Sequence, residues 1–239
     1  CEIHNCPALS DVDAAIQILR HLGCKVIRDG HTVEVDSSVI TVSEIPDDLM
    51  REMRSSIVFL GAVLARTGKA EISSPGGCEI GLRPIDLHLS SMRKLGAEIT
   101  EEHGRLYCSL GKCLHGADIT LSFPSVGATE NIMIADAAAA ADGTTVITNA
   151  AREPEISDLA DFLNGCGAKI SGAGDSTVVI EGTKKLHGTC HTVIPDRIEA
   201  SSYLIAASAT GGRICIKDVI PAHIGALIPV LSEAGCDIT

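Results

Sequence analysis

The sequence has almost no aromatic side chains: its 239 residues include no Trp, two Tyr and three Phe. Proteins that stack single-stranded bases on aromatic platforms are therefore nearly excluded. Positive charge is also scarce, with 19 Lys and Arg against 31 Asp and Glu and a net charge of −12. This balance disfavours a protein that binds a nucleic-acid backbone, although it still allows a local cationic pocket for one small anion.

Long apolar runs are missing as well. The longest uncharged apolar stretch covers residues 57–65, which is too short to cross a bilayer. The first residues show no basic segment followed by an apolar one, so no signal peptide is predicted. We therefore expect a cytoplasmic protein without a membrane partner. Its core must be built from Ala, Val, Ile and Leu.

The ten cysteines contain no C-x-x-C pair, and the nine His do not stand at zinc-ligand spacing around them. The chain is too long for a typical disulfide-stapled scaffold. We therefore expect no metal site, no cofactor and no disulfide framework. Most cysteines are predicted to be small buried residues in a reducing compartment.

One pattern occurs four times: an amphipathic helix, a Gly, a small residue and then a strand. The glycines that end these helices are Gly23, Gly96, Gly167 and Gly235, which are 73, 71 and 68 residues apart. Each is placed as the residue that follows a helix end. In the three complete copies we expect two paired strands after the helix, over residues 25–28 with 32–36, 98–101 with 105–109, and 169–171 with 177–181.

A second type of helix alternates with the first and is apolar on most sides, so it should be buried all round. Its copies cover residues 49–65, 128–141 and 198–209, and strands are expected after them at 69–73, 144–148 and 213–217. The repeated unit is thus inner helix, strand, outer helix, strand, strand, which predicts an α/β fold. The chain opens at residues 1–3 and stops at residues 237–239 within expected strands, so we interpret it as truncated at both ends.

The connection from strand to outer helix has one long copy. It takes 8 or 9 residues in three copies but 13 between Ile72 and Ile85. This segment holds Cys78 between Gly-Gly and Glu, in a loop with three Gly and two Pro. Loops on rigid scaffolds commonly carry function. A reactive thiol and an incidental surface thiol both fit Cys78.

Other candidates suit an anion. Arg83 precedes Pro84 at an expected helix start, and Ser125 precedes a helix whose first residues are small. Arg54 stands just before the apolar part of an inner helix. Each of these residues also has a purely structural alternative. Arg83 could be a solvated Arg, Ser125 an ordinary N-cap, and Arg54 a surface Arg whose stem is buried. Glu153 could face a cleft or form an exposed ion pair.

Five motifs, in order, resemble the UDP-N-acetylglucosamine enolpyruvyl transferase family. They cover residues 53–57, 75–88, 125–131, 149–155 and 195–199. The resemblance extends over the whole chain. It implies an inside-out α/β barrel of repeated βαβαββ units, similar to EPSP synthase, with residues 1–194 as the catalytic-loop domain and 195–239 as part of a second domain.

The resemblance also implies an activity: transfer of the enolpyruvyl group of phosphoenolpyruvate to the 3′-hydroxyl of UDP-N-acetylglucosamine, with release of phosphate. This is the committed step of bacterial peptidoglycan synthesis and the target of fosfomycin. Cys78 would be the general acid and could form a covalent adduct. The substrate-binding residues would be Arg54, Arg83, Pro84, Ile85, Asp86, Leu87, Phe123, Pro124, Ser125, Val126 and Gly127, with Glu153 orienting a partner in the cleft.

The family's Lys-Asn pair would precede Cys1, and the aspartate that accepts the hydroxyl proton would lie beyond Thr239. We therefore expect these 239 residues alone to be inactive. A shikimate-3-phosphate enolpyruvyl transferase is an alternative, although the Cys78 loop argues against it. A clamp-like scaffold is the non-enzymatic alternative, although clamp helices line a basic pore and these inner helices are apolar.

Overall fold

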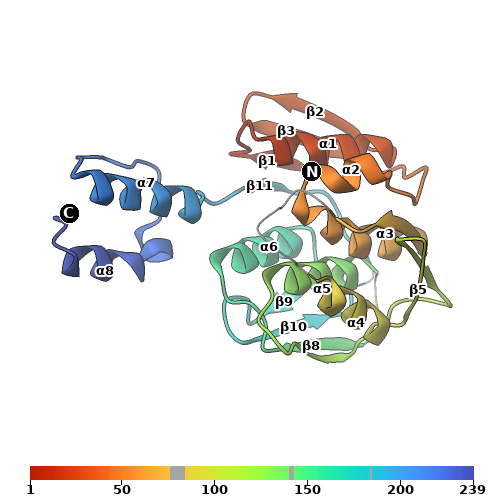
Figure 1. Cartoon of the computed structure of the whole chain (residues 1–239). Helices are drawn as coiled ribbons and strands as arrows, with labels where there is room; N and C mark the ends of the chain where they lie inside the picture. Colours follow the sequence, from red (N-terminus) through yellow and green to blue (C-terminus); the bar gives the residue numbers. More distant parts are fainter. Residues whose placement is uncertain (76–83, 140–142, 184) are drawn as a thin grey trace. The chain divides into compact units, whose positions relative to one another are not determined.

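The computed structural model describes residues 1–75, 84–139, 143–183 and 185–239 (Figure 1). The chain separates into two compact units, Cys1–Thr192 and Val193–Thr239. Our assignment of residues 1–194 and 195–239 to two domains of a larger protein stays a prediction. Within the described ranges, no helix is both long enough and apolar enough to cross a membrane.

All the described strands lie in the first unit and form three sheets with related order. The strands are β1 (Glu2–His4), β2 (Lys25–Asp29), β3 (Thr32–Asp36), β4 (Lys69–Ser73), β5 (Ala97–Glu102), β6 (Arg105–Leu110), β7 (Asp118–Thr120), β8 (Thr144–Thr148), β9 (Lys169–Ser171), β10 (Thr177–Glu181) and β11 (Cys190–Thr192). The sheet orders are β11-β1-β3-β2, β4-β6-β5 and β7-β8-β10-β9. The three strand pairs expected after the outer helices are confirmed.

The helices of the first unit are α1 (Ser10–His21), α2 (Asp47–Glu52), η1 (Arg54–Val58), α3 (Phe59–Thr67), α4 (Asp86–Lys94), α5 (Val126–Ala138) and α6 (Pro154–Gly165). Most side chains of α5 are buried, as expected for an inner helix. It contacts α3, α4, α6 and η1 (Figure 1). The largest apolar cluster includes residues from all of these helices and from the sheets around them.

The continuous inner helix predicted over residues 49–65 is wrong. The chain leaves the helical conformation at Met53, whose φ and ψ are −137° and 148°, and resumes as η1 and then α3. The Ser56 hydroxyl donates a 2.8 Å hydrogen bond to the carbonyl oxygen of Met50. That carbonyl would otherwise accept from the N–H of Arg54 in a continuing α-helix. The break places Arg54 at the start of a new element.

The second unit contains α7 (Arg197–Thr210), η2 (Pro221–Ile224) and α8 (Leu227–Glu233). The expected strands at residues 213–217 and 237–239 are not formed, because a strand needs a partner and this unit offers none. The expectation that the inner helix here is buried all round is also wrong. Ala200 is the buried residue of α7, and the described elements of its own unit leave the rest partly or fully exposed.

The nine described cysteines are all free, and Cys78 lies outside the described residues. Cys24, Cys108 and Cys166 are buried. The prediction that most cysteines are buried is therefore wrong for the described part of the chain. Several stand on exposed strand or loop positions, which sequence patterns did not separate from core positions.

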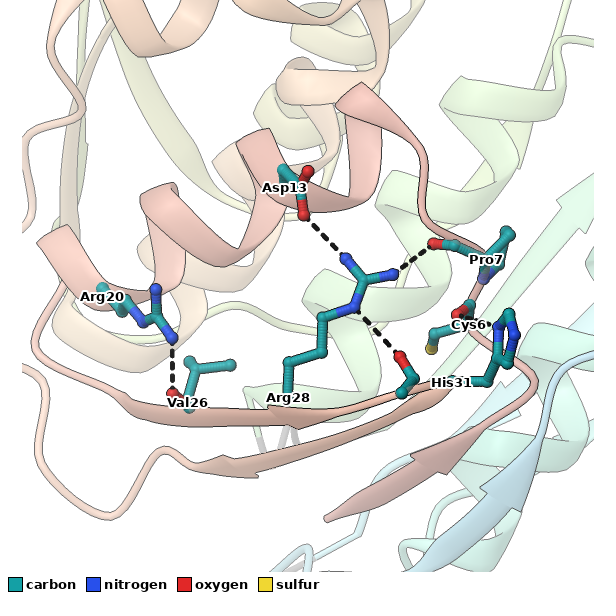
Figure 2. A network of polar contacts seen from close by, with 8 residues as sticks. Cys6, Pro7, Asp13, Arg20, Val26, Arg28 and His31 are labelled. Atoms are coloured by element: carbon teal, nitrogen blue, oxygen red, sulfur yellow. Dashed lines mark hydrogen bonds and ion pairs between the residues drawn. The ribbon is translucent and has the colours of Figure 1, made fainter.

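Arg28 on β2 anchors the loop between β1 and α1, as Figure 2 shows. Its guanidinium donates to the Asp13 carboxylate at 2.7 Å, to the Pro7 carbonyl at 2.7 Å and to the Gly30 carbonyl at 3.3 Å. One side chain thus joins the β2–β3 hairpin, the loop and the outer helix. This charge-assisted arrangement gives Arg28 a structural role.

The contact between α3 and α5 generates a stability prediction at Gly61. A Cβ built there would overlap with Asn131 Oδ1, and would lie 2.7 Å from the Asn131 carbonyl oxygen and 3.0 Å from Ala135 Cβ. We expect Gly61→Ala to force the two helices apart and to lower stability by about 1–3 kcal/mol. A thermal melt should show a loss of about 2–4 °C per kcal/mol.

Gly111→Ala is the matched control, because the nearest atom to its added Cβ is Glu98 Oε1 at 3.9 Å. This variant should melt close to the wild type. Equal melting temperatures for the Gly61 and Gly111 variants would contradict the close approach of α3 and α5.

Candidate functional site

The candidate site is built around the first turn of α5. Ser125 precedes this helix in an extended conformation, and its Oγ accepts a 3.3 Å hydrogen bond from the Ala128 N–H. The first N–H groups of a helix have no acceptor inside it and point towards its N-terminal end, where the helix dipole favours negative charge. The N-cap considered for Ser125 from the sequence is therefore present, and its role in substrate binding stays a prediction.

His88 on α4 lies against this helix start. A Cβ added at Gly127 would stand 3.2 Å from His88 Cε1 and 3.4 Å from its Nε2. The absence of a side chain at Gly127 therefore lets the imidazole approach the α5 backbone closely. The His88 side chain is buried, although the residue lies only two positions after the exposed Asp86.

Asn131 holds the imidazole from the other direction. Its Oδ1 accepts a 2.9 Å hydrogen bond from the Gly61 N–H, which fixes the orientation of the amide. Its Nδ2 then donates to the Ile57 carbonyl and to His88 Nδ1, both at 3.1 Å. Because the amide donates, Nδ1 must be the unprotonated nitrogen of a neutral ring. One side chain on α5 thus joins α3, η1 and α4.

Electrostatics agree with a neutral His88. Burial lowers the pKa of its imidazole to about 4, and the positive charge of Arg54 acts in the same direction against the smaller opposing effect of Asp86. The ring is therefore uncharged near neutral pH. Arg54 starts η1, which contacts α5, and Asp86 starts α4 two residues before His88.

The turn before α6 is held close to α5 as well. Asn149 has a φ of 58° and donates to the Leu121 carbonyl at 2.9 Å. The Ala151 N–H donates to Thr129 Oγ1 at 3.1 Å. Glu153, the residue before α6, accepts a 2.9 Å hydrogen bond from the Arg152 N–H. The turn therefore places Glu153 beside the second turn of α5.

Three carboxyl groups gather there. Burial raises the pKa of Glu130 on α5, and the neighbouring charges of Glu155 and Glu153 raise it further. An anion in this region therefore needs positive charge to offset these acids. Of the cationic candidates that the sequence predicted, the structure describes Arg54.

The structure thus brings together Arg54, Asp86, Gly127 and the Ser125 cap, and it places Glu153 near the same helix. Ile85, Leu87 and Val126 pack partly against the main core cluster. Phe123 is 66% exposed, and Pro84 and Pro124 are exposed too. Cys78 and Arg83 lie outside the described residues, so their predicted roles stay predictions.

Sequence reasoning missed His88 and Asn131 as site residues, although both stood within quoted motifs. The available signal was a polar residue on the otherwise apolar, inward-facing side of a helix. Such a residue needs a buried hydrogen-bond partner. The sequence did not show that each would supply the other's partner.

The lowered pKa of His88 predicts a pH effect on stability. Between pH 6.5 and about 4 the unfolded chain binds a proton at His88 and the folded chain does not, so acid destabilises the fold. The shift corresponds to about 3 kcal/mol, fully lost once the pH is below both values. His88→Asn keeps an acceptor for Asn131 and should remove this loss in urea unfolding measured across that range.

The pH dependence of stability must be compared between the variant and the wild type, because Asp136 also contributes to it. Burial raises the pKa of Asp136 to about 6, and its effect on stability has the opposite sign to that of His88. Asp136 favours the folded state at low pH and loses that contribution as the pH rises through 6. Exposed His21→Asn is the control and should follow the wild type. A His88→Asn protein with the pH dependence of the wild type would contradict the buried, neutral imidazole.

Comparison with known proteins places this geometry in a family. The family model described as EPSP synthase (3-phosphoshikimate 1-carboxyvinyltransferase) matches residues 1–239. A UDP-N-acetylglucosamine 1-carboxyvinyltransferase 2 of Caldanaerobacter subterraneus subsp. tengcongensis is 56% identical over 99% of this chain and 56% of its own length. A UDP-N-acetylglucosamine 1-carboxyvinyltransferase of Acidiphilium cryptum is 49% identical over 100% of this chain and 56% of its own length.

Two solved structures are also similar to this chain. The enolpyruvyl transferase NikO from Streptomyces tendae matches with a TM-score of 0.75 and 27% identity, over 86% of this chain and 48% of that one. EPSP synthase from Acinetobacter baumannii, at 20% identity and a TM-score of 0.72, shares the fold over 100% of this chain and 54% of its own. The chain spans about half the length of the curated relatives it matches. The α/β fold class and the resemblance inferred from the motifs are confirmed, and the chain belongs to the EPSP synthase family.

Proposed function

We propose that this chain is part of an enzyme that transfers the enolpyruvyl group of phosphoenolpyruvate to the 3′-hydroxyl of UDP-N-acetylglucosamine and releases phosphate. The observation that carries the proposal is that three motifs far apart in the sequence supply residues around His88, which lies against the first turn of α5. Arg54 comes from η1, Asp86 from α4, and the Ser125 cap from α5 itself. The hydrogen bonds of Asn131 hold these elements together.

The relatives support this substrate. Curated proteins at 48–56% identity carry the name UDP-N-acetylglucosamine 1-carboxyvinyltransferase. The neighbours named as EPSP synthase are 20% identical and support the fold alone. We therefore favour the sugar nucleotide over shikimate-3-phosphate as the acceptor. An enzyme of this activity would serve peptidoglycan synthesis in the cytoplasm and would need no cofactor.

The helix start suits one anionic part of the sugar nucleotide. The N–H groups of the first turn of α5 and the Arg54 guanidinium supply donors and positive charge for the diphosphate. His88 is neutral near pH 7, so it does not add to that charge and acts as a positioning group. We assign Arg83 a second cationic contact. The acids Glu130, Glu153 and Glu155 would repel an anion placed on their part of the helix.

We assign the proton transfer to Cys78. Its thiol would give a proton to the methylene carbon of phosphoenolpyruvate, while the 3′-oxygen of the sugar bonds to the adjacent carbon and passes its proton to a base. The tetrahedral ketal then loses a proton from the methyl carbon, and the bond to phosphate breaks. A thiol fits this role because its pKa can be tuned towards the working pH, and the thiolate can also attack carbon.

Cys78 should be the functionally reactive thiol. In the full-length protein that contains these residues, fosfomycin should alkylate Cys78. Cys78→Ser should lower kcat/KM by at least about 100-fold, which is the lower end of the effect of a general acid. Mass spectrometry of the adduct and a phosphate-release assay measure the two effects.

Cys113→Ser, at an exposed thiol of the first unit, is the control and should keep both activity and alkylation. An adduct on another cysteine, or a Cys78→Ser enzyme of normal activity, would show that the assignment is mistaken.

Arg54 should contribute to binding of the sugar nucleotide. Arg54→Ala in the full-length protein should weaken UDP-N-acetylglucosamine binding about 10- to 100-fold by calorimetry, because a hydrogen bond to a charged group contributes about 1.5–3 kcal/mol. Arg51→Ala, an exposed arginine three residues earlier, is the matched control. Equal affinities for the two variants would remove Arg54 from the site.

A further inference from the structure

Three potential metal ligands meet on the exposed face of the sheet β11-β1-β3-β2, away from the candidate site. Glu2 and His4 alternate with Ile3 along β1, so their side chains share a face. Cys190 stands directly opposite Glu2 in the parallel pair of β1 and β11. Ile3 faces the other side of the sheet, where its cross-strand partner Val33 is buried.

The donor atoms of these residues are close enough to share one ion. The carboxylate oxygen of Glu2, the imidazole nitrogen of His4 and the Cys190 Sγ all lie within 4.8 Å of one another. Glu2 Oε1 and His4 Nε2 are 3.4 Å apart. Two ligands on a tetrahedral zinc ion are about 3.3–3.6 Å apart, given the usual zinc–ligand distances. The oxygen and nitrogen already stand at this spacing, and small rotations of the Cys190 side chain would bring in the sulfur.

The orientation of the imidazole is a second, independent observation. His4 Nδ1 is 3.1 Å from the Oγ1 atom of Thr32 on β3. When Nδ1–H donates to this hydroxyl, Nε2 carries a lone pair directed at Glu2 and Cys190. Histidines that bind metals are usually held in this way, with the second ring nitrogen bonded to a protein oxygen that fixes tautomer and rotation.

We propose that Glu2, His4 and Cys190 form a binding site for a zinc ion. A thiolate and an imidazole favour zinc over magnesium or calcium, which prefer oxygen ligands alone. Glu2 and Cys190 are exposed, so the ion reaches the site from solvent and a water molecule completes four-coordination. Among the described residues, this is the one group of three donors with such spacing.

The ion would act as a clasp between β1 and β11. These strands are three residues each, and their pairing joins the first and last segments of the first unit. A bound zinc ion adds a link from Cys190 to both Glu2 and His4. Because the ion binds the folded chain, it stabilises that state, and the gain rises with the logarithm of one plus the ratio of free zinc concentration to dissociation constant.

The test uses cobalt(II), which replaces zinc in such sites and absorbs in the near ultraviolet when a thiolate binds it. The chain should show this charge-transfer band with one equivalent of cobalt, and zinc should displace it. Cys190→Ser should abolish the band, and His4→Ala should weaken zinc binding at least about tenfold in a chelator competition. Zinc should raise the melting temperature of the wild type and not that of Cys190→Ser.

Two controls separate coordination from adventitious binding. Cys1→Ser removes a neighbouring exposed thiol, and Glu34→Gln removes a carboxylate across from Glu2 on the same sheet. Both should keep the band. Circular dichroism checks that each variant is folded, which is expected because these side chains are exposed or half-exposed. A band that survives Cys190→Ser, disappears with Cys1→Ser, or never forms in the folded wild type would overturn the proposal.

Discussion

The arrangement of the candidate site depends on one buried amide, that of Asn131. Its oxygen is bonded to the backbone of α3, and its nitrogen to the backbone of η1 and to the imidazole on α4. Each of these groups would cost about 1–3 kcal/mol if it were left buried without a partner. The amide therefore admits one relative position of the three elements. The residues around the first turn of α5 are therefore positioned by contacts that lie deeper in the core.

The three sheets share one feature, which concerns the segments that lead into the inner helices. Each inner helix is preceded by a short extended segment that pairs in parallel with the strand of a sheet: Glu44 with Glu71, β7 with β8, and β11 with β1. The segments that lead into the helices are thus fixed at their start by a sheet. Ser125 lies between β7 and α5, and Arg54 follows α2 and opens η1, so each backbone has regular structure on both sides. Backbones fixed in this way lose little freedom when a ligand binds.

Sequence patterns located most strands of the first unit and the Gly residues after the outer helices, because both have short periods and local causes, but they missed β7 and β11. The break at Met53 was missed because it depends on a side-chain hydrogen bond, that of Ser56, which competes with the helix. His88 and Asn131 are 43 residues apart, and His4 and Cys190 lie on opposite ends of the first unit. No spacing rule reaches such distances, since tertiary packing alone makes these pairs. The pattern of residues 213–217 predicts a strand, but a strand also requires the edge of another strand with which to pair.

The pairing of β11 with β1 has a consequence for how the chain acquires its fold. One edge of β1 is covered early by β3, but the other waits for residues 190–192, which leave the ribosome about 190 residues later. Contacts between residues so far apart in the sequence form slowly, because the entropy cost of closing a long loop comes before the contacts contribute any stability. During that interval β1 presents an open edge, to which another nascent chain can add a strand. Binding of a chaperone to the newly made β1 segment would protect this edge until β11 is synthesised.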